Sequence, residues 1–245
     1  MGLFRNAVLA SLAAAATAGS ASAAIPSVSV RIEQVGAGFI TVNPAANPVD
    51  GGYTYSGNVS MWGFQSSFDL SSNFKSAPGN DAFGGFFTLK NTTAAVQQFI
   101  IDLTVTNDPF SGNALAGGSV GGILLGGPGG GLLQGVGNGA VWQAIINRPA
   151  GSTTIASLMS GNPFTVTTGA NQGGGIAREF FGNSPQIPSL PIGPLGTSRT
   201  IRMQFLLGAG NEVSLSTSFV VQVPAPGAIA LLGLAGLAGR GRRRD

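Results

Sequence analysis

The sequence contains neither cysteine nor histidine, and only 9% of its 245 residues are charged. Without these two residue types the chain cannot build a Ser-His-Asp triad, a cysteine nucleophile, or the common zinc and haem ligand sets. It also has no disulfide framework, so an exported body would depend on its core alone. Hydrophobic residues make up 43% of the sequence, which argues against a disordered, charge-rich chain.

The basic character of the sequence belongs to its two ends. The formal net charge is +3 and the pI is about 10.0, values that by themselves suggest a nucleic acid or a membrane surface as partner. Five of the 12 basic residues, however, are Arg5, Arg240, Arg242, Arg243 and Arg244. Residues 24–223 carry seven basic and eight acidic side chains, a net charge of −1. We therefore predict no nucleic-acid partner.

The first 23 residues have the three parts of a secretory signal peptide. Arg5 supplies the basic start, residues 7–16 form an apolar run, and Ala21-Ser22-Ala23 matches the small-residue cleavage site. We predict a signal helix at 1–23, passage through the Sec translocon, and cleavage after Ala23 or Ala24. The alternative is an Ala-rich first helix of the domain, although the apolar run lacks a polar face.

Residues 224–245 combine a proline motif, an apolar stretch and a basic end. Pro224-Ala225-Pro226 precedes the 13 residues 227–239, and the four C-terminal arginines follow. Thirteen residues are short for a spanning helix, but flanking residues and local bilayer thinning can compensate. The arginines would keep that end cytoplasmic. This order resembles a PEP-CTERM sorting domain, the tail that exosortases read in Gram-negative bacteria. Glu is usual in that family at the position of Ala225.

The resemblance implies a route and a set of partners. The protein would be held in the inner membrane by a C-terminal hydrophobic helix and processed by an exosortase. It would then reach the cell surface or extracellular matrix of a Gram-negative-type bacterium. The alternative is an ordinary C-terminal membrane anchor. In either case the exported body is first tethered at its C-terminus.

Residues 24–223 show the period-two alternation of apolar and polar residues that predicts β-strands. The clearest runs are 28–33, 99–105, 201–207 and 213–223, and shorter candidates are 38–42, 57–65, 84–90 and 163–168. Residues 141–147 and 153–158 predict a hairpin with a five-residue loop. The glycine-rich segment 112–139 fits either a loop or closely packed strands. About ten strands predict one all-β domain, an antiparallel β-sandwich of jelly-roll or immunoglobulin-like type.

The body offers few candidates for chemistry. Its scattered acidic residues include Asp50, Asp69, Asp81, Asp102, Asp108, Glu179 and Glu212. A glycosidase-like pair would require two of them to converge in space. Four aromatic residues are candidates for stacking on sugar rings, namely Tyr53, Tyr55, Trp62 and Trp142. We predict no catalytic residue, cofactor or metal.

These observations favour a structural or adhesive protein of the surface or matrix. Two alternatives remain open. One is an extracellular carbohydrate-binding module that retains exopolysaccharide, and the other is a hydrolase with a carboxylate pair.

Overall fold

The structure is a computed structural model that describes residues 25–73, 80–106, 110–137, 139–161, 163–183 and 187–223. These residues form strands and loops and contain no helix. The predicted signal peptide at 1–23 and the predicted sorting tail at 224–245, with their two expected helices, lie outside the described residues.

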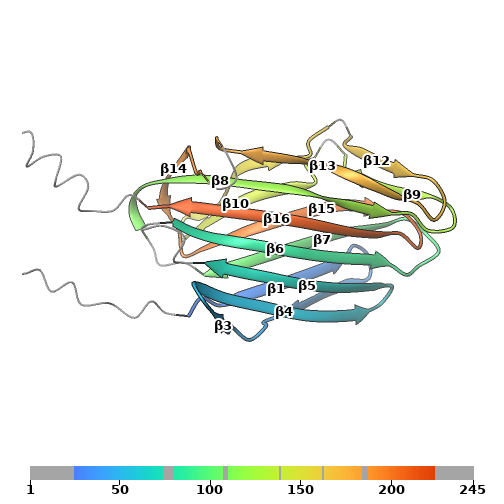
Figure 1. Cartoon of the computed structure of the whole chain (residues 1–245), viewed down its shortest axis with the longest axis horizontal. Coiled ribbons are helices and arrows are strands. Elements are labelled where there is room, and N and C mark those ends of the chain that lie inside the picture. Colours follow the sequence, from blue (N-terminus) through green and yellow to red (C-terminus); the bar gives the residue numbers. More distant parts are fainter. Residues whose placement is uncertain are drawn as a thin grey trace, which may run out of the picture.

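The strands form two antiparallel sheets that pack face to face (Figure 1). Sheet A has the order β11–β10–β15–β7–β1–β2, and β9 pairs with both β15 and β12. Its strands are β1 (Val28–Gln34), β2 (Gly38–Val42), β7 (Gln97–Thr106), β9 (Gly131–Gly135), β10 (Trp142–Arg148), β11 (Gly151–Leu158), β12 (Thr165–Thr168) and β15 (Ser198–Leu207).

Sheet B has the order β13–β8–β16–β6–β5–β4–β3, and β14 also pairs with β8. Its strands are β3 (Asn47–Val49), β4 (Gly52–Met61), β5 (Phe64–Asn73), β6 (Asn80–Asn91), β8 (Phe110–Leu125), β13 (Gly173–Phe181), β14 (Leu190–Leu195) and β16 (Glu212–Gln222). The all-β antiparallel sandwich predicted from the sequence is therefore confirmed.

The core lies between the sheets and consists of every second residue of the central strands. In sheet A, Ile32 of β1, Ile101 of β7 and Met203 of β15 form one rank across neighbouring strands, and all three are fully buried. In sheet B, Phe87 of β6 and Leu215 of β16 form a matching rank. Because successive side chains of a strand point to opposite faces, this pattern leaves polar residues on both outer faces.

Several strand predictions are confirmed and others are wrong. The runs 28–33, 38–42, 99–105 and 201–207 lie in strands as expected, 213–223 does so except for its last residue, and 84–90 lies within β6. The run 57–65 instead spans the end of β4, a turn at 62–63, and the start of β5. The predicted five-residue hairpin loop contains only Pro149 and Ala150, because Arg148 already pairs with Gly151. The described residues form 16 strands instead of the predicted ten or so, because short, polar or glycine-rich strands were not recognised in the sequence.

Half of the glycine-rich segment, residues 112–125, belongs to the long internal strand β8 of sheet B, and residues 131–135 form β9 of sheet A. Its glycines allow close packing at several points. A Cβ atom on Gly118 would lie 2.5 Å from the carbonyl oxygen of Ser218 and 2.6 Å from the ring of Phe181. This half of the segment is therefore an internal strand whose missing side chains make room for its neighbours.

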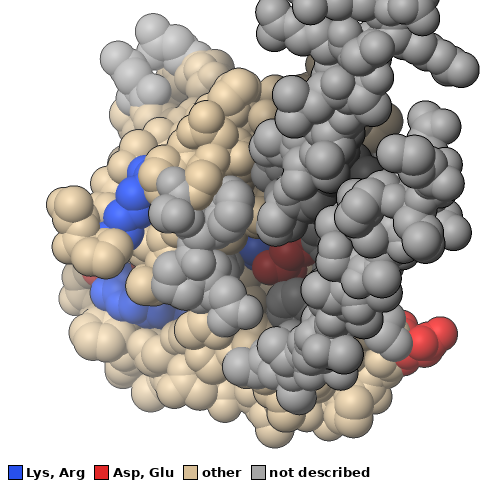
Figure 2. Space-filling model, turned by 90° about the vertical axis from the view of Figure 1, so that its left-hand side faces the viewer, with Lys and Arg blue, Asp and Glu red and all other residues tan. Residues whose placement is uncertain are grey.

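The described chain starts and ends at the same end of the sandwich, which we call the terminal end (Figure 1). The hydroxyl of Tyr55 in β4 donates a hydrogen bond of 2.8 Å to the carbonyl oxygen of Pro26 there. Charged side chains are sparse on this end, and uncharged residues form most of its visible described surface (Figure 2). Turns at 35–37 and 62–63 lie at the opposite end, which we call the distal end.

Candidate functional site

The outer face of sheet B is lined with hydroxyl and amide side chains. Each contributing strand alternates inward apolar residues with outward polar ones, and the registers place the outward residues in ranks across the strands. We call this surface the polar face. Its members include Thr54, Ser56, Asn58, Ser60, Gln65, Ser67, Asp69, Ser71, Thr88, Lys90, Glu212, Ser214, Ser216 and Ser218.

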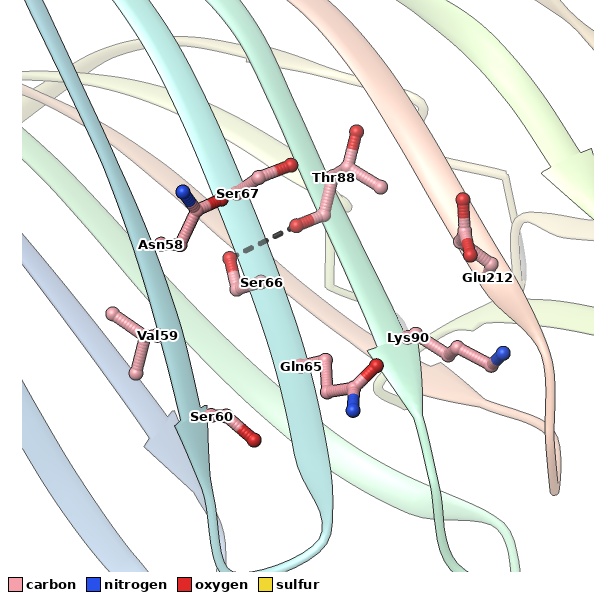
Figure 3. A pocket seen from close by; sticks show the side chains of 9 residues that line it. All are labelled: Asn58, Val59, Ser60, Gln65, Ser66, Ser67, Thr88, Lys90 and Glu212. Atoms are coloured by element: carbon pink, nitrogen blue, oxygen red, sulfur yellow. Dashed lines mark hydrogen bonds between the residues drawn. The ribbon is translucent and has the colours of Figure 1, made fainter.

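A shallow groove of about 450 Å³ lies on the polar face (Figure 3). It crosses β4, β5, β6 and β16, and it is lined by Asn58, Val59, Ser60, Gln65, Ser66, Ser67, Thr88, Lys90 and Glu212. The hydroxyl of Ser66 donates a hydrogen bond of 2.9 Å to the carbonyl oxygen of Thr88, which helps to hold the floor in place. The groove therefore runs across the strands and is lined mainly by uncharged donors and acceptors.

One end of the groove carries two opposite charges. Lys90 of β6 pairs in register with Glu212 of β16, so the charges lie on neighbouring strands and offset each other. Next to them, the hydroxyl of Thr88 donates a hydrogen bond of 3.1 Å to the hydroxyl of Ser214. The groove is thus polar but close to neutral overall.

An exposed aromatic ring, that of Phe86, lies beside the groove. Phe86 is two residues before Thr88 on the same face of β6, and 61% of it is exposed. Its neighbours in register are Asp69 of β5 and Ser216 of β16. Gly84, two residues earlier, cannot take a side chain, because a Cβ atom would clash with the backbone of β16 at Thr217. An exposed apolar ring therefore has a glycine as its neighbour along the strand, within a hydroxyl-rich surface.

The four aromatic residues that the sequence predicted for sugar stacking lie in different environments in the structure. Tyr55 and Trp142 are 1% and 0% exposed, so that prediction is wrong for both of them. Each lies at an inward position of its strand, and the indole of Trp142 donates a hydrogen bond of 2.6 Å to the hydroxyl of Thr217. Tyr53 also points inward and is half-buried. Trp62 is 50% exposed in the turn after β4.

The sequence analysis missed Phe86, although a signal was present. Phe86 and Phe87 are adjacent in a strand, so one ring must face outward when the other enters the core. Phe87 is fully buried and pairs with Leu215. The doublet shows that one ring is exposed, but only the register decides which one.

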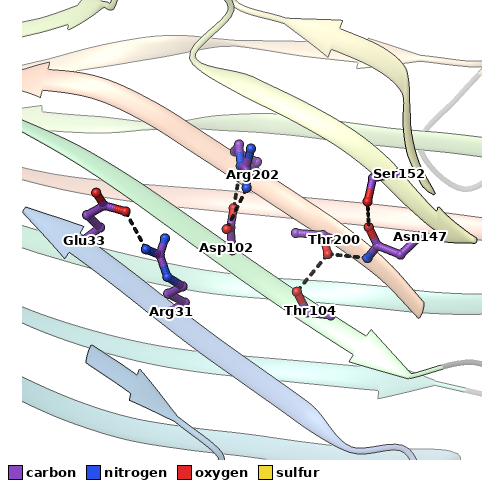
Figure 4. A network of polar contacts seen from close by, with 8 residues as sticks. All are labelled: Arg31, Glu33, Asp102, Thr104, Asn147, Ser152, Thr200 and Arg202. Atoms are coloured by element: carbon purple, nitrogen blue, oxygen red, sulfur yellow. Dashed lines mark hydrogen bonds and ion pairs between the residues drawn. The ribbon is translucent and has the colours of Figure 1, made fainter. Parts of the chain in front are cut away.

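Most of the described acidic side chains form structural contacts, and Figure 4 shows those of Glu33 and Asp102. On the outer face of sheet A, Asp102 accepts hydrogen bonds of 2.7 and 2.9 Å from the guanidinium of Arg202, and these bonds raise the pKa of Arg202. Arg31 similarly pairs with Glu33 at 2.6 Å. Two further contacts join Arg199 to Asp81 and the backbone N–H of Met159 to Glu179. Asp108 lies outside the described residues, and Asp50 lies in the turn before β4.

The acidic residues of the polar face do not form a pair of the glycosidase kind. By their registers, Asp69 and Glu212 lie two strands and four residues apart, a separation of roughly 16 Å. Carboxylate pairs in glycosidases are separated by about 5 to 9.5 Å. No group of three or more acidic residues that could hold a metal ion occurs in the part of the chain that the structure describes.

The predicted sorting residues Pro224, Ala225, Pro226 and the four C-terminal arginines lie outside the described residues, as do Ala21 and Ala23. Within the described ranges, no helix is long and apolar enough to cross a membrane.

Comparisons with known proteins are sparse. No protein-family model and no curated protein matches the chain. Among solved structures, the chain is similar to TmCBM61 in complex with beta-1,4-galactotriose, with 11% identity, 64% of this chain and 88% of that chain covered, and a TM-score of 0.26. It is also similar to the structure of infectious bursal disease virus Gx strain, with 13% identity, 83% of this chain and 67% of that chain covered, and a TM-score of 0.12. Both likenesses are too weak to carry an argument about a ligand.

Proposed function

We propose that this protein is an exported, surface- or matrix-associated β-sandwich that retains neutral polysaccharide on the polar face of sheet B. The observation that carries the proposal is the groove across β4, β5, β6 and β16, with the exposed ring of Phe86 beside it. A glycan offers hydroxyl groups along its edges and apolar C–H faces on its rings. The groove supplies partners for the first and Phe86 supplies a surface for the second.

The charge of the site favours an uncharged glycan. Lys90 and Glu212 lie opposite each other, and the other groove-lining side chains are neutral. A strongly anionic polymer would need a cluster of basic side chains, which the groove does not contain. The open shape also suits a long chain that enters and leaves across the strands, rather than a small molecule that must be enclosed.

Equilibrium binding of the full-length protein, purified in detergent, to a panel of soluble neutral polysaccharides tests this proposal. We expect Phe86→Ala to weaken binding about tenfold, corresponding to roughly 1.4 kcal/mol. The matched control is Phe39→Ala, because Phe39 is 59% exposed on the outer face of sheet A. Gln65→Ala and its control Gln98→Ala, on the outer face of sheet A, probe the groove in the same way.

Two results would contradict retention of polysaccharide. One is the absence of saturable binding to every neutral polymer in the panel, which would leave a structural body without a glycan ligand. The other is an equal loss of affinity in Phe86→Ala and Phe39→Ala, which would place the ligand elsewhere.

The C-terminal tether is a second part of the proposal, and it rests on the sequence of residues 224–245. We propose that the tail holds the body at the inner membrane until an exosortase processes it. Pulse-chase labelling of the native protein beside a Pro224→Ala/Pro226→Ala variant tests this step. We expect the variant to remain unprocessed in the membrane fraction. Identical processing and location of the two proteins would overturn the sorting proposal and leave the glycan proposal standing.

A further inference from the structure

Strand β2 (Gly38–Val42) is an open edge of sheet A. One side of it pairs with β1, and no strand of the described chain pairs with the other side. Its sequence, Gly-Phe-Ile-Thr-Val, contains no charge and no proline, and its register with β1 is unbroken. Proteins usually block such edges with lysine, proline or bulges, because unpaired N–H and C=O groups recruit another strand.

The other edge strands carry more of these protections. In sheet B, β3 has three residues and includes Pro48, and β13 contains Arg178 and Glu179 with a shift of register. In sheet A, β11 has a register shift in its pairing with β10, and β12 has three threonines among its four residues. β14 (Leu190–Leu195), which pairs only with β8, contains two prolines and two register shifts. Of the described edges, β2 therefore combines an uncharged, proline-free sequence with an unbroken register.

Exposed apolar side chains gather around β2. Phe39 is 59% exposed, Trp62 is 50% exposed and Val35 is 39% exposed. The indole of Trp62 lies over Gly38, 3.3 Å from where a Cβ atom would be, and Gly38 has a φ of +144°. Trp62 itself has a φ of +46°, which is unfavourable for an aromatic residue. A residue with a strained backbone thus places a half-exposed ring beside an open strand, and residues strained in this way cluster at functional sites.

We propose that β2 is a homophilic docking edge, which pairs antiparallel with β2 of a second copy about a two-fold axis at Ile40. The strand is self-complementary in this register. Ile40 would lie opposite Ile40 of the other copy on the core side, and Phe39 would lie opposite Thr41 on the outer side. Core-facing and outward residues therefore continue in phase from one sheet A to the next, as a stable register requires. The contact is isologous, so it closes with two copies.

The position of β2 determines how the two bodies lie relative to each other. β2 pairs with Val30–Gln34, the part of β1 farthest from Pro26, so it belongs to the distal half of the sandwich. A two-fold axis perpendicular to the sheet reverses the strands, and the two terminal ends then point in opposite directions. Two copies whose C-termini are coupled to surfaces can therefore pair in this way only when those surfaces face each other. The pairing therefore acts as adhesion between surfaces.

Disulfide trapping tests the contact directly, because the native chain contains no cysteine. In the full-length protein, Ile40→Cys places each sulfur opposite its counterpart in the other copy. We expect a cross-linked dimer under mild oxidation. The control Ser157→Cys, on the exposed edge of β11, should form no cross-linked dimer. Absence of the Ile40→Cys dimer, or equal cross-linking in the control, would overturn the proposal.

A second pair of variants leaves the core untouched. Thr41 and Thr154 are both exposed residues of edge strands of sheet A. In sedimentation of the full-length protein, we expect the native chain to dimerise with rising concentration and Thr41→Lys to remain monomeric at the same concentrations. Thr154→Lys should dimerise like the native chain. A native chain that stays monomeric, or a Thr41→Lys variant that dimerises normally, would overturn the proposal.

Beads that carry the full chain coupled through its C-terminus test the facing arrangement. Two differently labelled populations of native beads should cluster together, and Thr41→Lys beads should not join them. Dimers in solution without clustering of beads would overturn the arrangement between surfaces. Binding of polysaccharide by Thr41→Lys should be unchanged, so failure of the docking edge and failure of the glycan proposal are distinguishable.

Discussion

The indole N–H of Trp142 donates a hydrogen bond of 2.6 Å to the hydroxyl of Thr217, across the interior of the sandwich. Trp142 begins β10 in sheet A, and Thr217 lies in the middle of β16 in sheet B. Both side chains are buried, at 0% and 4% exposed. This bond explains why a threonine occupies a core position between Leu215 and Phe219. It also excludes Trp142 from any contact with a ligand at the surface.

Removal of one partner of this bond should destabilise the fold. Thr217→Val leaves the indole N–H buried without an acceptor, and Trp142→Phe leaves the hydroxyl without its donor. We expect each variant to lower the free energy of unfolding by about 1 to 3 kcal/mol. The double variant should lose less than the sum of the two. Urea unfolding followed by circular dichroism measures all three, and strict additivity would show that the two groups are not coupled.

The ion pair between Arg199 and Asp81 predicts an asymmetric response to mutation. Arg199 is fully buried, and its Nη1 lies 2.7 Å from the Oδ2 of Asp81, which is 21% exposed. The Nε and Nη2 atoms have no hydrogen-bond partner among the described residues. Asp81→Asn leaves a buried charge uncompensated, and we expect a loss of about 3 to 5 kcal/mol. Arg199→Met combined with Asp81→Leu should be close to neutral or stabilising in the same unfolding measurement.

Stability should fall above pH 10 partly because of Tyr55. Burial raises the pKa of Tyr55 above the 10.0 of an exposed tyrosine. Below pH 10 the hydroxyl is protonated in both the folded and the unfolded chain, so this contribution is fully present. As the pH rises above 10 the unfolded chain loses the proton first, and the stability decreases until the folded pKa is passed.

Tyr55→Phe isolates this effect. At neutral pH we expect it to cost about 1 kcal/mol, because the hydrogen bond to the carbonyl of Pro26 is lost. Above pH 10 its stability should decline less steeply than that of the native chain. Urea unfolding at several alkaline pH values provides the comparison, and parallel curves for the two proteins would contradict the prediction.

Two glycines on sheet B should respond in opposite ways to alanine. At Gly84 a Cβ atom would clash with the backbone of β16 at Thr217, so strands β6 and β16 would have to separate. We expect Gly84→Ala to cost about 1 to 3 kcal/mol or more. At Gly175 in β13 nothing lies within 4 Å of the added carbon. Gly175→Ala should be neutral or stabilising by up to about 1 kcal/mol. Thermal unfolding measures both variants, and equal costs would contradict the packing argument.

The candidate site shows how much of a binding surface can be predicted from sequence patterns. Alternation correctly placed Tyr53 and Tyr55 on one face of a strand, but it could not assign that face to the core. The assignment depends on which neighbouring strand lies alongside and which sheet lies opposite. The same uncertainty explains why the exposure of Phe86 was not predicted. Phe86 and Phe87 are equivalent in the sequence, and only the register that pairs Phe87 with Leu215 shows which ring is buried. The groove depends on four strands that are up to 154 residues apart in the chain, from Asn58 to Glu212.

By itself the sequence determined the all-β class, most of the regular strands and the near-neutral charge of the body. These properties are local, because period-two alternation and composition are written along one strand at a time. The tertiary structure decided that half of the glycine-rich segment is an internal strand, that two aromatic candidates are buried, and that β2 is left as an open edge. Each of these depends on pairing between distant segments, where side-chain volume and backbone hydrogen bonds are shared by strands that no single stretch of sequence contains.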